Sequence, residues 1–327
     1  MRRRQYRGKE AGFSLLEILV VTAILAGAAY VALDTVEHDS GQIRFETTER
    51  RLAAIRRAIV GEPGVYANGA PVVQGYVADV GQLPPCLEAL LQQIADCDDD
   101  GTDEIAPNLY AVTDGVIAFG WRGPYLTGSG GVLRDAWGNT DEDVDGDGSP
   151  DGNRGWDIVV DDLAPSFDAS SRGRDRAAGD VGGEGGYSVD QVMQTIDAND
   201  LTVSLTATAV NVMVTNNTAA DIDVCLAVIT PDTTDAEADD WTYFPSDAGP
   251  ETVLAGASTT LNYSSAGVVT PGLRTFAVYD ENNADVTNCV ISAGQEATVL
   301  GSAATRRYPL LLAARLAPSA DLTFAQP

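Results

Sequence analysis

Residues 13–33, FSLLEILVVTAILAGAAYVAL, form an apolar run of 21 residues in which Glu17 is the sole charged side chain. A helix rises about 1.5 Å per residue, so this run just spans the roughly 30 Å hydrocarbon layer of a bilayer. Four arginines and one lysine crowd residues 1–12, and three acidic residues follow within residues 34–39. The positive-inside rule places the N-terminus in the cytoplasm and the remaining chain across the membrane.

The helix is expected to continue beyond the span to about Val60. Four apolar residues recur there at helical spacing between charged ones: Phe45, Leu52, Ile55 and Ile59. Gly61 and Pro63 follow, and both residue types end helices. We expect this apolar stripe to pack against a globular head.

Composition limits the possible class of protein. The chain has 327 residues, enough for two packed domains beyond the apolar run. Its net charge of −28 repels nucleic-acid phosphates, so no nucleic-acid partner is expected. Such an acidic excess is either a solvated surface or a polyanion that takes up divalent cations, and both interpretations remain open.

The usual catalytic sets are missing from the sequence. One histidine, His38, lies just past the apolar run, and one lysine, Lys9, lies before it. No nucleophile-base motif and no phosphate-binding loop accompanies them. We therefore expect that the protein is not an enzyme.

Four cysteines fall as one close pair and one distant pair, each inside a separate predicted domain. The close pair is Cys86 and Cys97, and the distant pair is Cys225 and Cys289. Two disulfides are the simplest interpretation, and they require an oxidising compartment. The alternative, four free buried thiols in a cytosolic protein, fits poorly with an N-terminal apolar run that places the remaining chain across the membrane.

Two acidic loops repeat one spacing of side-chain oxygens around a glycine. The candidate ligands are Asp96, Asp98, Asp100 and Glu104 in the first loop, and Asp143, Asp145, Asp147 and Asp151 in the second. Alternating carboxylates that converge where a glycine turns the chain are typical of calcium loops. Pro107 and Arg154 stand where an EF-hand has its last glutamate, so neither loop is an EF-hand. Structural calcium is the prediction, and two solvated turns are the alternative.

Residues 197–327 show the period-two alternation of short strands separated by Asn, Asp, Gly and Pro turns. Seven or eight such strands predict a β-sandwich. Cys225 and Cys289, with Trp241 between them, have a spacing compatible with an immunoglobulin-like disulfide between two sheets. Thr287 stands two residues before Cys289, where immunoglobulin domains have a tyrosine. This domain either binds a surface or secreted ligand or serves as a spacer.

The junction between the basic leader and the apolar run resembles a known export signal. Residues 12–17, GFSLLE, resemble the prepilin signal of type IV pilins and type II secretion pseudopilins. The resemblance implies cleavage by prepilin peptidase between Gly12 and Phe13, followed by methylation of the Phe13 amine. It also implies that Glu17 pairs with the Phe13 amine of a neighbouring subunit. The alternative is a plain signal anchor with a protonated Glu17 near the interface.

Short phrases within residues 61–196 resemble the major pseudopilin of type II secretion, in the same order. They are VGQLPP at 80–85, WRGPYL at 121–126, DAWGN at 135–139, WDIV at 156–159 and GGEG at 182–185. The resemblance implies a long helix packed on a small antiparallel sheet, and a calcium-ordered loop in this part of the head. The chain continues far past the family's end, which favours a low-copy or tip subunit.

Together these observations predict an α+β protein with four parts. They are a leader at 1–12, a long helix at 13–60, a pseudopilin-like head at 61–196 and a C-terminal β-sandwich at 197–327. The expected function is that of a structural subunit in a type II secretion pseudopilus or related type IV filament. The alternative is a minor type IV pilin that acts as an adhesin through its last domain. The expected partners are the inner membrane, prepilin peptidase and other subunits, with the body periplasmic or extracellular.

Overall fold

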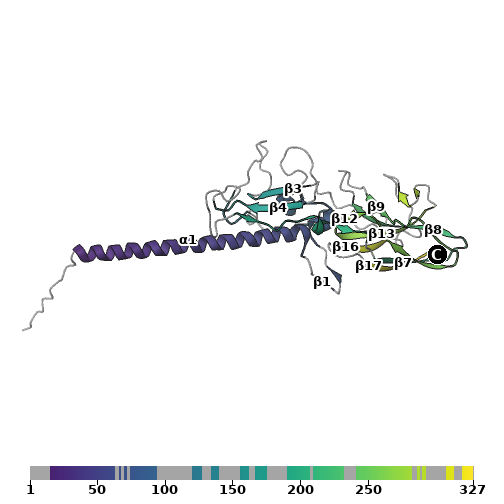
Figure 1. Cartoon of the computed structure of the whole chain (residues 1–327), viewed down its shortest axis with the longest axis horizontal. Helices are drawn as coiled ribbons and strands as arrows, with labels where there is room; N and C mark the ends of the chain where they lie inside the picture. Colours follow the sequence, from purple (N-terminus) through teal and green to yellow (C-terminus); the bar gives the residue numbers. More distant parts are fainter. Residues whose placement is uncertain are drawn as a thin grey trace, which may run out of the picture.

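The computed structural model describes residues 15–62, 66–67, 70–71, 74–93, 120–126, 134–139, 155–161, 166–174, 190–206, 209–231, 241–281, 286–287, 289–291, 307–312 and 319–326. One long helix, α1 (Leu15–Val60), projects from a body of several small sheets (Figure 1). The predicted α+β class is confirmed at this level. The head sheet lies beside the second half of α1, and the C-terminal sheets continue beyond its end (Figure 1).

The second half of α1 holds the head. Leu52, Ile55 and Ile59 are buried in one core, as their spacing predicts, because residues three and four apart share one helix face. The short helix α2 (Tyr76–Val80) packs on this end of α1. A Cβ on Gly75 would lie 2.7 Å from the Ile59 carbonyl oxygen, so only glycine permits this close approach.

The head contains few regular elements. They are β1 (Tyr66–Ala67), β2 (Ala70–Pro71), the 3₁₀ helix η1 (Leu87–Leu90), β3 (Asp157–Asp161), β4 (Ser166–Ser171), β5 (Gln191–Val192) and α3 (Ala198–Leu201). Strands β3, β4 and β5 form an antiparallel sheet in that order, whose buried residues Phe167 and Ala169 share the core with α1. Asp197 caps α3, because its carboxylate accepts the backbone N–H groups of Asn199 and Asp200.

Among the described residues, every regular element from Val203 onward is a strand. They are β6 (Val203–Ser204), β7 (Ala209–Asn216), β8 (Ile222–Pro231), β9 (Trp241–Pro245), β10 (Glu251–Val253), β11 (Ser258–Tyr263), β12 (Val268–Val269), β13 (Gly272–Asp280), β14 (Val286–Thr287), β15 (Val290–Ile291), β16 (Arg307–Leu312) and β17 (Ser319–Gln326). A five-stranded sheet has the order β10-β8-β13-β16 with β9 also on β8, and a three-stranded sheet has the order β11-β7-β17. Buried residues of both sheets form a second core. The last strand, β17, runs parallel to β7.

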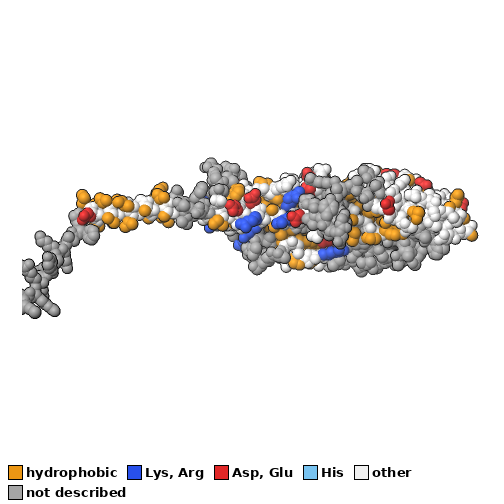
Figure 2. All heavy atoms as spheres, turned by 90° about the horizontal axis from the view of Figure 1, so that it is seen from below, with side chains coloured by type: hydrophobic (Ala, Val, Ile, Leu, Met, Phe, Trp, Pro, Cys, Tyr) orange, Lys and Arg blue, Asp and Glu red, His pale blue; other side chains and the backbone are white. Residues whose placement is uncertain are grey.

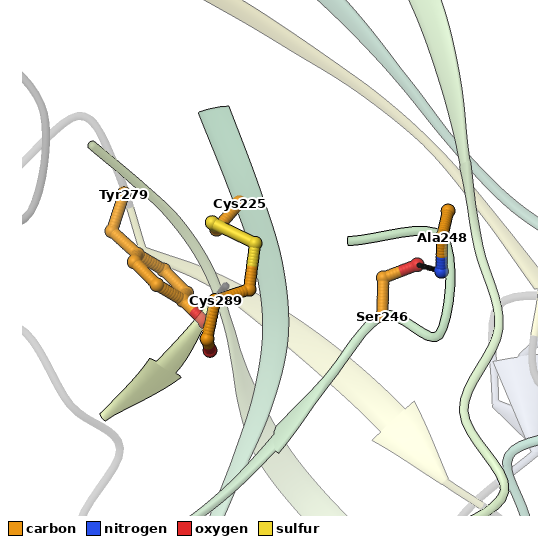
Figure 3. Close-up of a disulfide and its surroundings, with 5 residues drawn as sticks. All are labelled: Cys225, Ser246, Ala248, Tyr279 and Cys289. Carbon is orange, nitrogen blue, oxygen red and sulfur yellow. Dashed lines mark hydrogen bonds between the residues drawn. A yellow bond between two sulfur atoms is a disulfide. The ribbon is translucent and has the colours of Figure 1, made fainter. Parts of the chain in front are cut away.

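The disulfide between Cys225 and Cys289 forms as predicted, but it does not join the two large sheets (Figure 3). In β8, Val224, Leu226 and Val228 point into the second core, whereas Cys225 belongs to a separate cluster on the opposite face. Cys289 lies between β14 and β15, which pair with each other. The disulfide therefore ties this hairpin to the outer face of the five-stranded sheet, which corrects the expected inter-sheet placement.

Three buried tyrosines predict instability at high pH. Burial raises the pKa of Tyr76, Tyr263 and Tyr279 well above the usual value, which is about 10. The unfolded chain releases these protons first, so their contribution to stability is complete below about pH 10 and is lost as the pH rises further. Each tyrosine should lower the free energy of unfolding by about 1.4 kcal/mol per pH unit there. Denaturant titrations at increasing pH, with tyrosinate absorbance recorded in parallel, check this. Full ionisation of the folded protein without loss of stability would contradict it.

Candidate functional site

The first half of α1 is the most exposed apolar feature in the described chain. By length and composition, Leu15–Leu33 can cross a membrane, and no part of it is buried against the body. Figure 2 shows its apolar side chains along the projecting helix, where Leu15 is 82% and Leu33 70% exposed. Soluble proteins rarely leave an apolar surface of this extent in water. This segment therefore needs lipid or protein around it.

Two polar side chains interrupt this apolar surface. The Thr22 hydroxyl donates to the carbonyl oxygens of Ile18 and Leu19, at 3.0 and 2.9 Å, so the helix itself satisfies it. Glu17 lies in the first turn of α1 and is exposed. A carboxylate is costly in hydrocarbon unless it is neutralised by a proton or a cation. The cleavage and methylation residues, Gly12 and Phe13, lie outside the described part of the chain.

The segment 134–139, which contains the DAWGN phrase, clamps the head onto α1. The Ala136 N–H donates to the hydroxyl of Thr48, a fully buried residue of α1, at 3.1 Å. The guanidinium of Arg51 donates to the Arg134 carbonyl, and that of Arg44 lies 5.8 Å from the centre of the Trp137 ring. Contacts of this kind hold the segment along about two turns of the helix.

A buried carboxylate shapes that segment. Asp135 is 2% exposed, and its Oδ1 accepts the backbone N–H groups of Gly138 and Asn139 at 2.9 and 3.0 Å. Its Oδ2 accepts the hydroxyl of Ser171 in β4 at 2.7 Å and also the Asn139 side-chain amide. A buried charge needs such a full set of donors. Asp135 thus links the turn to β4 by a hydrogen bond, while the same turn makes hydrogen bonds to α1.

The predicted calcium ligands are not placed by the structure. All eight of them, Asp96, Asp98, Asp100, Glu104, Asp143, Asp145, Asp147 and Asp151, lie outside the described residues. Within the residues that are described, no group of three or more histidine, cysteine or acidic side chains could hold a metal ion. Cys86 is buried and disulfide-bonded, and its predicted partner Cys97 is also outside the described ranges.

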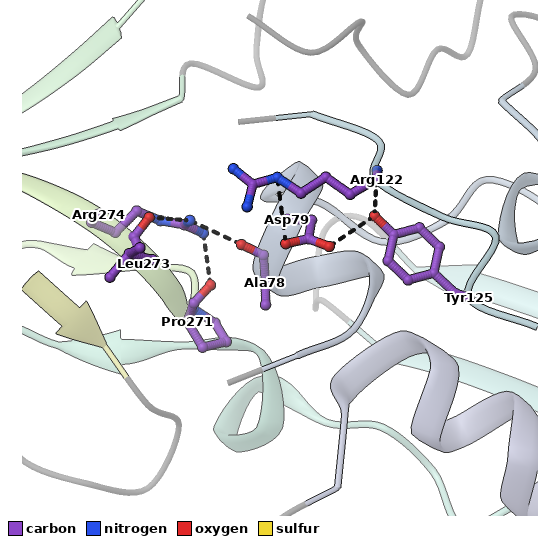
Figure 4. A network of polar contacts seen from close by, with 7 residues as sticks. All are labelled: Ala78, Asp79, Arg122, Tyr125, Pro271, Leu273 and Arg274. Atoms are coloured by element: carbon purple, nitrogen blue, oxygen red, sulfur yellow. Dashed lines mark hydrogen bonds and ion pairs between the residues drawn. The ribbon is translucent and has the colours of Figure 1, made fainter. Parts of the chain in front are cut away.

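A polar network at the junction of the two cores was missed by the sequence analysis (Figure 4). The Tyr125 hydroxyl donates to Asp79 Oδ2 at 3.1 Å, and it accepts the Arg122 backbone N–H at 3.0 Å. The Arg122 guanidinium lies 4.0 Å from Asp79 Oδ1. Burial raises the pKa of Asp79, and the Tyr125 hydrogen bond and the nearby cations oppose that shift. A second cation in this network, Arg274, comes from the C-terminal sheet.

Comparison with known proteins adds nothing to this geometry. No protein-family model matches the chain, and neither a curated protein nor a solved structure does.

Proposed function

We propose that the chain is a structural subunit of a type IV filament, most specifically of a type II secretion pseudopilus. One observation carries the proposal. The helix α1 is divided into an exposed apolar half, Leu15–Leu33, and a half whose apolar stripe lies in the core of the head. A helix built this way can stay in a bilayer or among its own copies while it holds a folded body outside.

Charge in the apolar half supports the same proposal. Glu17 is the sole acid there, and it follows the GFSLL phrase of a prepilin signal. In the proposed filament, Glu17 pairs with the methylated Phe13 amine of a neighbouring subunit and so sets the axial register. The acidic loops at 96–104 and 143–151 are proposed as structural calcium sites on the head of that subunit.

A second candidate function is that of a minor type IV pilin with an adhesive C-terminal domain. It is favoured by the position of that domain, which has its own core and lies beyond the end of α1, away from the apolar half (Figure 1). Neighbouring genes for a secretion ATPase and a secretin would support the pseudopilus. Genes for adhesion or twitching motility would support the pilin.

The mature N-terminus tests the proposal. In cells that contain prepilin peptidase, mass spectrometry should find a chain that begins with methylated Phe13. Glu17→Ala should still be cleaved, because the peptidase acts before the helix assembles, but it should be lost from sheared filament fractions. An intact Met1, or a cleavage after the apolar run near residue 34, would exclude prepilin processing.

A neighbouring substitution provides the control for Glu17→Ala. Leu19→Ala alters another exposed residue of the same helix, 61% accessible, and leaves the carboxylate in place. It should be cleaved and assembled nearly as well as the parent chain. Equal incorporation of Glu17→Ala and Leu19→Ala would remove the pairing role from Glu17 without affecting the cleavage result.

A further inference from the structure

The two cores of the body meet at a very short linker. Leu201 belongs to the core of the head, and Val203 belongs to the core of the C-terminal sheets, so Thr202 alone separates them. A short linker limits how far two domains can separate, but it still allows them to rotate about the connection. Domains joined through a small contact move relative to each other by default. A fixed orientation therefore requires a specific contact across the junction.

Arg274 makes such a contact. It lies on β13 in the C-terminal domain and is 1% exposed. Its Nη1 donates to the carbonyl oxygen of Ala78 in α2 at 3.0 Å, across the junction (Figure 4). Its Nη2 donates to the Pro271 carbonyl at 2.7 Å and to the Thr270 hydroxyl at 2.9 Å, within its own domain. Acceptors in the C-terminal domain thus fix the guanidinium, which donates across the junction to the backbone carbonyl of Ala78 in α2.

The charge of Arg274 is balanced mainly from the other domain. Burial lowers its pKa to about 10, and the carboxylate of Asp79, next to Ala78, favours the charged form. Asp79 is itself fixed by Tyr125 and Arg122, which belong to the head. A buried cation is stable only where its donors and its counter-charge are in place. Other orientations of the domains would move the guanidinium away from both.

The backbone beside Arg274 fits only this arrangement. Gly272 has a φ of +143°, and a Cβ added there would collide with the Arg274 guanidinium and with the Ala78 carbonyl oxygen. The first residue of β13 therefore touches the same atom of α2 that accepts the Arg274 hydrogen bond. Glycine lets the two backbones meet, and arginine fixes the angle at which they meet.

We infer that Arg274 is an orientation lock that fixes the C-terminal domain on α2, and through α2 on α1, as one rigid unit. Loss of Arg274 should affect both orientation and stability, because removing one partner of a buried charge pair also destabilises the fold. The C-terminal domain is thus a fixed extension of the helix axis and not a tethered module. The inference does not depend on filament assembly.

The test measures orientation and stability separately, in the full chain held in detergent. Spin labels are attached to cysteines introduced at Val192 in the head and Leu254 in the C-terminal domain, which are 67% and 59% exposed. The parent should give one narrow distribution of label distances. Without denaturant, where the chain stays folded, Arg274→Met should broaden it. The midpoint of denaturant unfolding, measured separately, should fall, because the Ala78 and Pro271 carbonyls lose a buried donor. Leu273→Met, at the adjacent exposed position of β13, should keep the narrow distribution.

The outcomes separate the lock from a merely structural role. A narrow, unshifted distribution in Arg274→Met overturns the inference. If Arg274→Met does not fold, Gly272→Ala decides, because its Cβ collides with both the Arg274 guanidinium and the Ala78 carbonyl oxygen and so breaks the contact between them. A shifted mean distance in Gly272→Ala supports the lock, and an unchanged distance overturns it.

Discussion

Ile55→Ala is expected to lower the free energy of unfolding by about 2–5 kcal/mol. Ile55 is completely buried, and it lies in the core of the head with residues of α2, β4 and η1. Alanine removes three carbon atoms and leaves a cavity between a long helix and a sheet that cannot close on it. Denaturant unfolding followed by near-ultraviolet circular dichroism measures the loss.

The same helix provides the control. Ile43 has the same side chain, lies on α1 and is 63% exposed, so Ile43→Ala leaves no cavity. Its effect should stay within about 0.5 kcal/mol. Alanine has a higher helix propensity than isoleucine, so propensity cannot produce a loss at either position. Equal losses at Ile43 and Ile55 would therefore mean that burial in the head does not account for the loss at Ile55. A small loss of unfolding free energy in Ile55→Ala would mean that packing of the head on α1 contributes little to stability.

The long helix was predictable because its two halves carry different patterns. The exposed half is apolar on every side, so its composition alone indicates a segment that avoids water. The other half repeats Leu52, Ile55 and Ile59 at helical spacing, and those residues are buried as predicted. Helical periodicity encodes which face is covered, but it does not encode the partner that covers it.

The place of the C-terminal disulfide was not predictable in the same way. Alternation along β8 separates Cys225 from Val224 and Leu226, but both sets are apolar and both are buried. From the sequence, either face of β8 could therefore have lined the core between the two sheets. The sequence separation of the cysteines carries no information about the face, because a hairpin outside the two large sheets supplies Cys289.

The candidate site was predictable only where side-chain types define it. Glu17 stands out as a carboxylate in an apolar run, so its pattern alone singles it out. The contact of Arg274 with Ala78 joins residues 196 positions apart, and its acceptor is a backbone carbonyl that any residue would supply. The one available signal was an arginine inside a mostly apolar strand. It indicates a buried partner without identifying that partner.

Joint replacement of Cys225 and Cys289 by alanine is expected to lower the free energy of unfolding by about 4 kcal/mol. The disulfide links residues 64 positions apart, and closing a loop of that size restricts the unfolded chain by about this amount. The loss also frees the β14–β15 hairpin from the outer face of the five-stranded sheet, where Cys289 is fully buried. Denaturant unfolding of the double variant and the parent, both under oxidising conditions, measures the difference.

Tyr279→Phe separates the covalent link from the packing around it. The Tyr279 hydroxyl donates to the Cys289 carbonyl oxygen at 2.6 Å, and Tyr279 lies opposite Cys225 in the strand register (Figure 3). Phenylalanine removes this hydrogen bond while the ring and the disulfide remain, so the loss should be about 1 kcal/mol. A loss as large as that of the double cysteine variant would mean that the hairpin is held by its buried polar contact. The expected order, with the double variant several times more costly, would assign most of the loss to the covalent link.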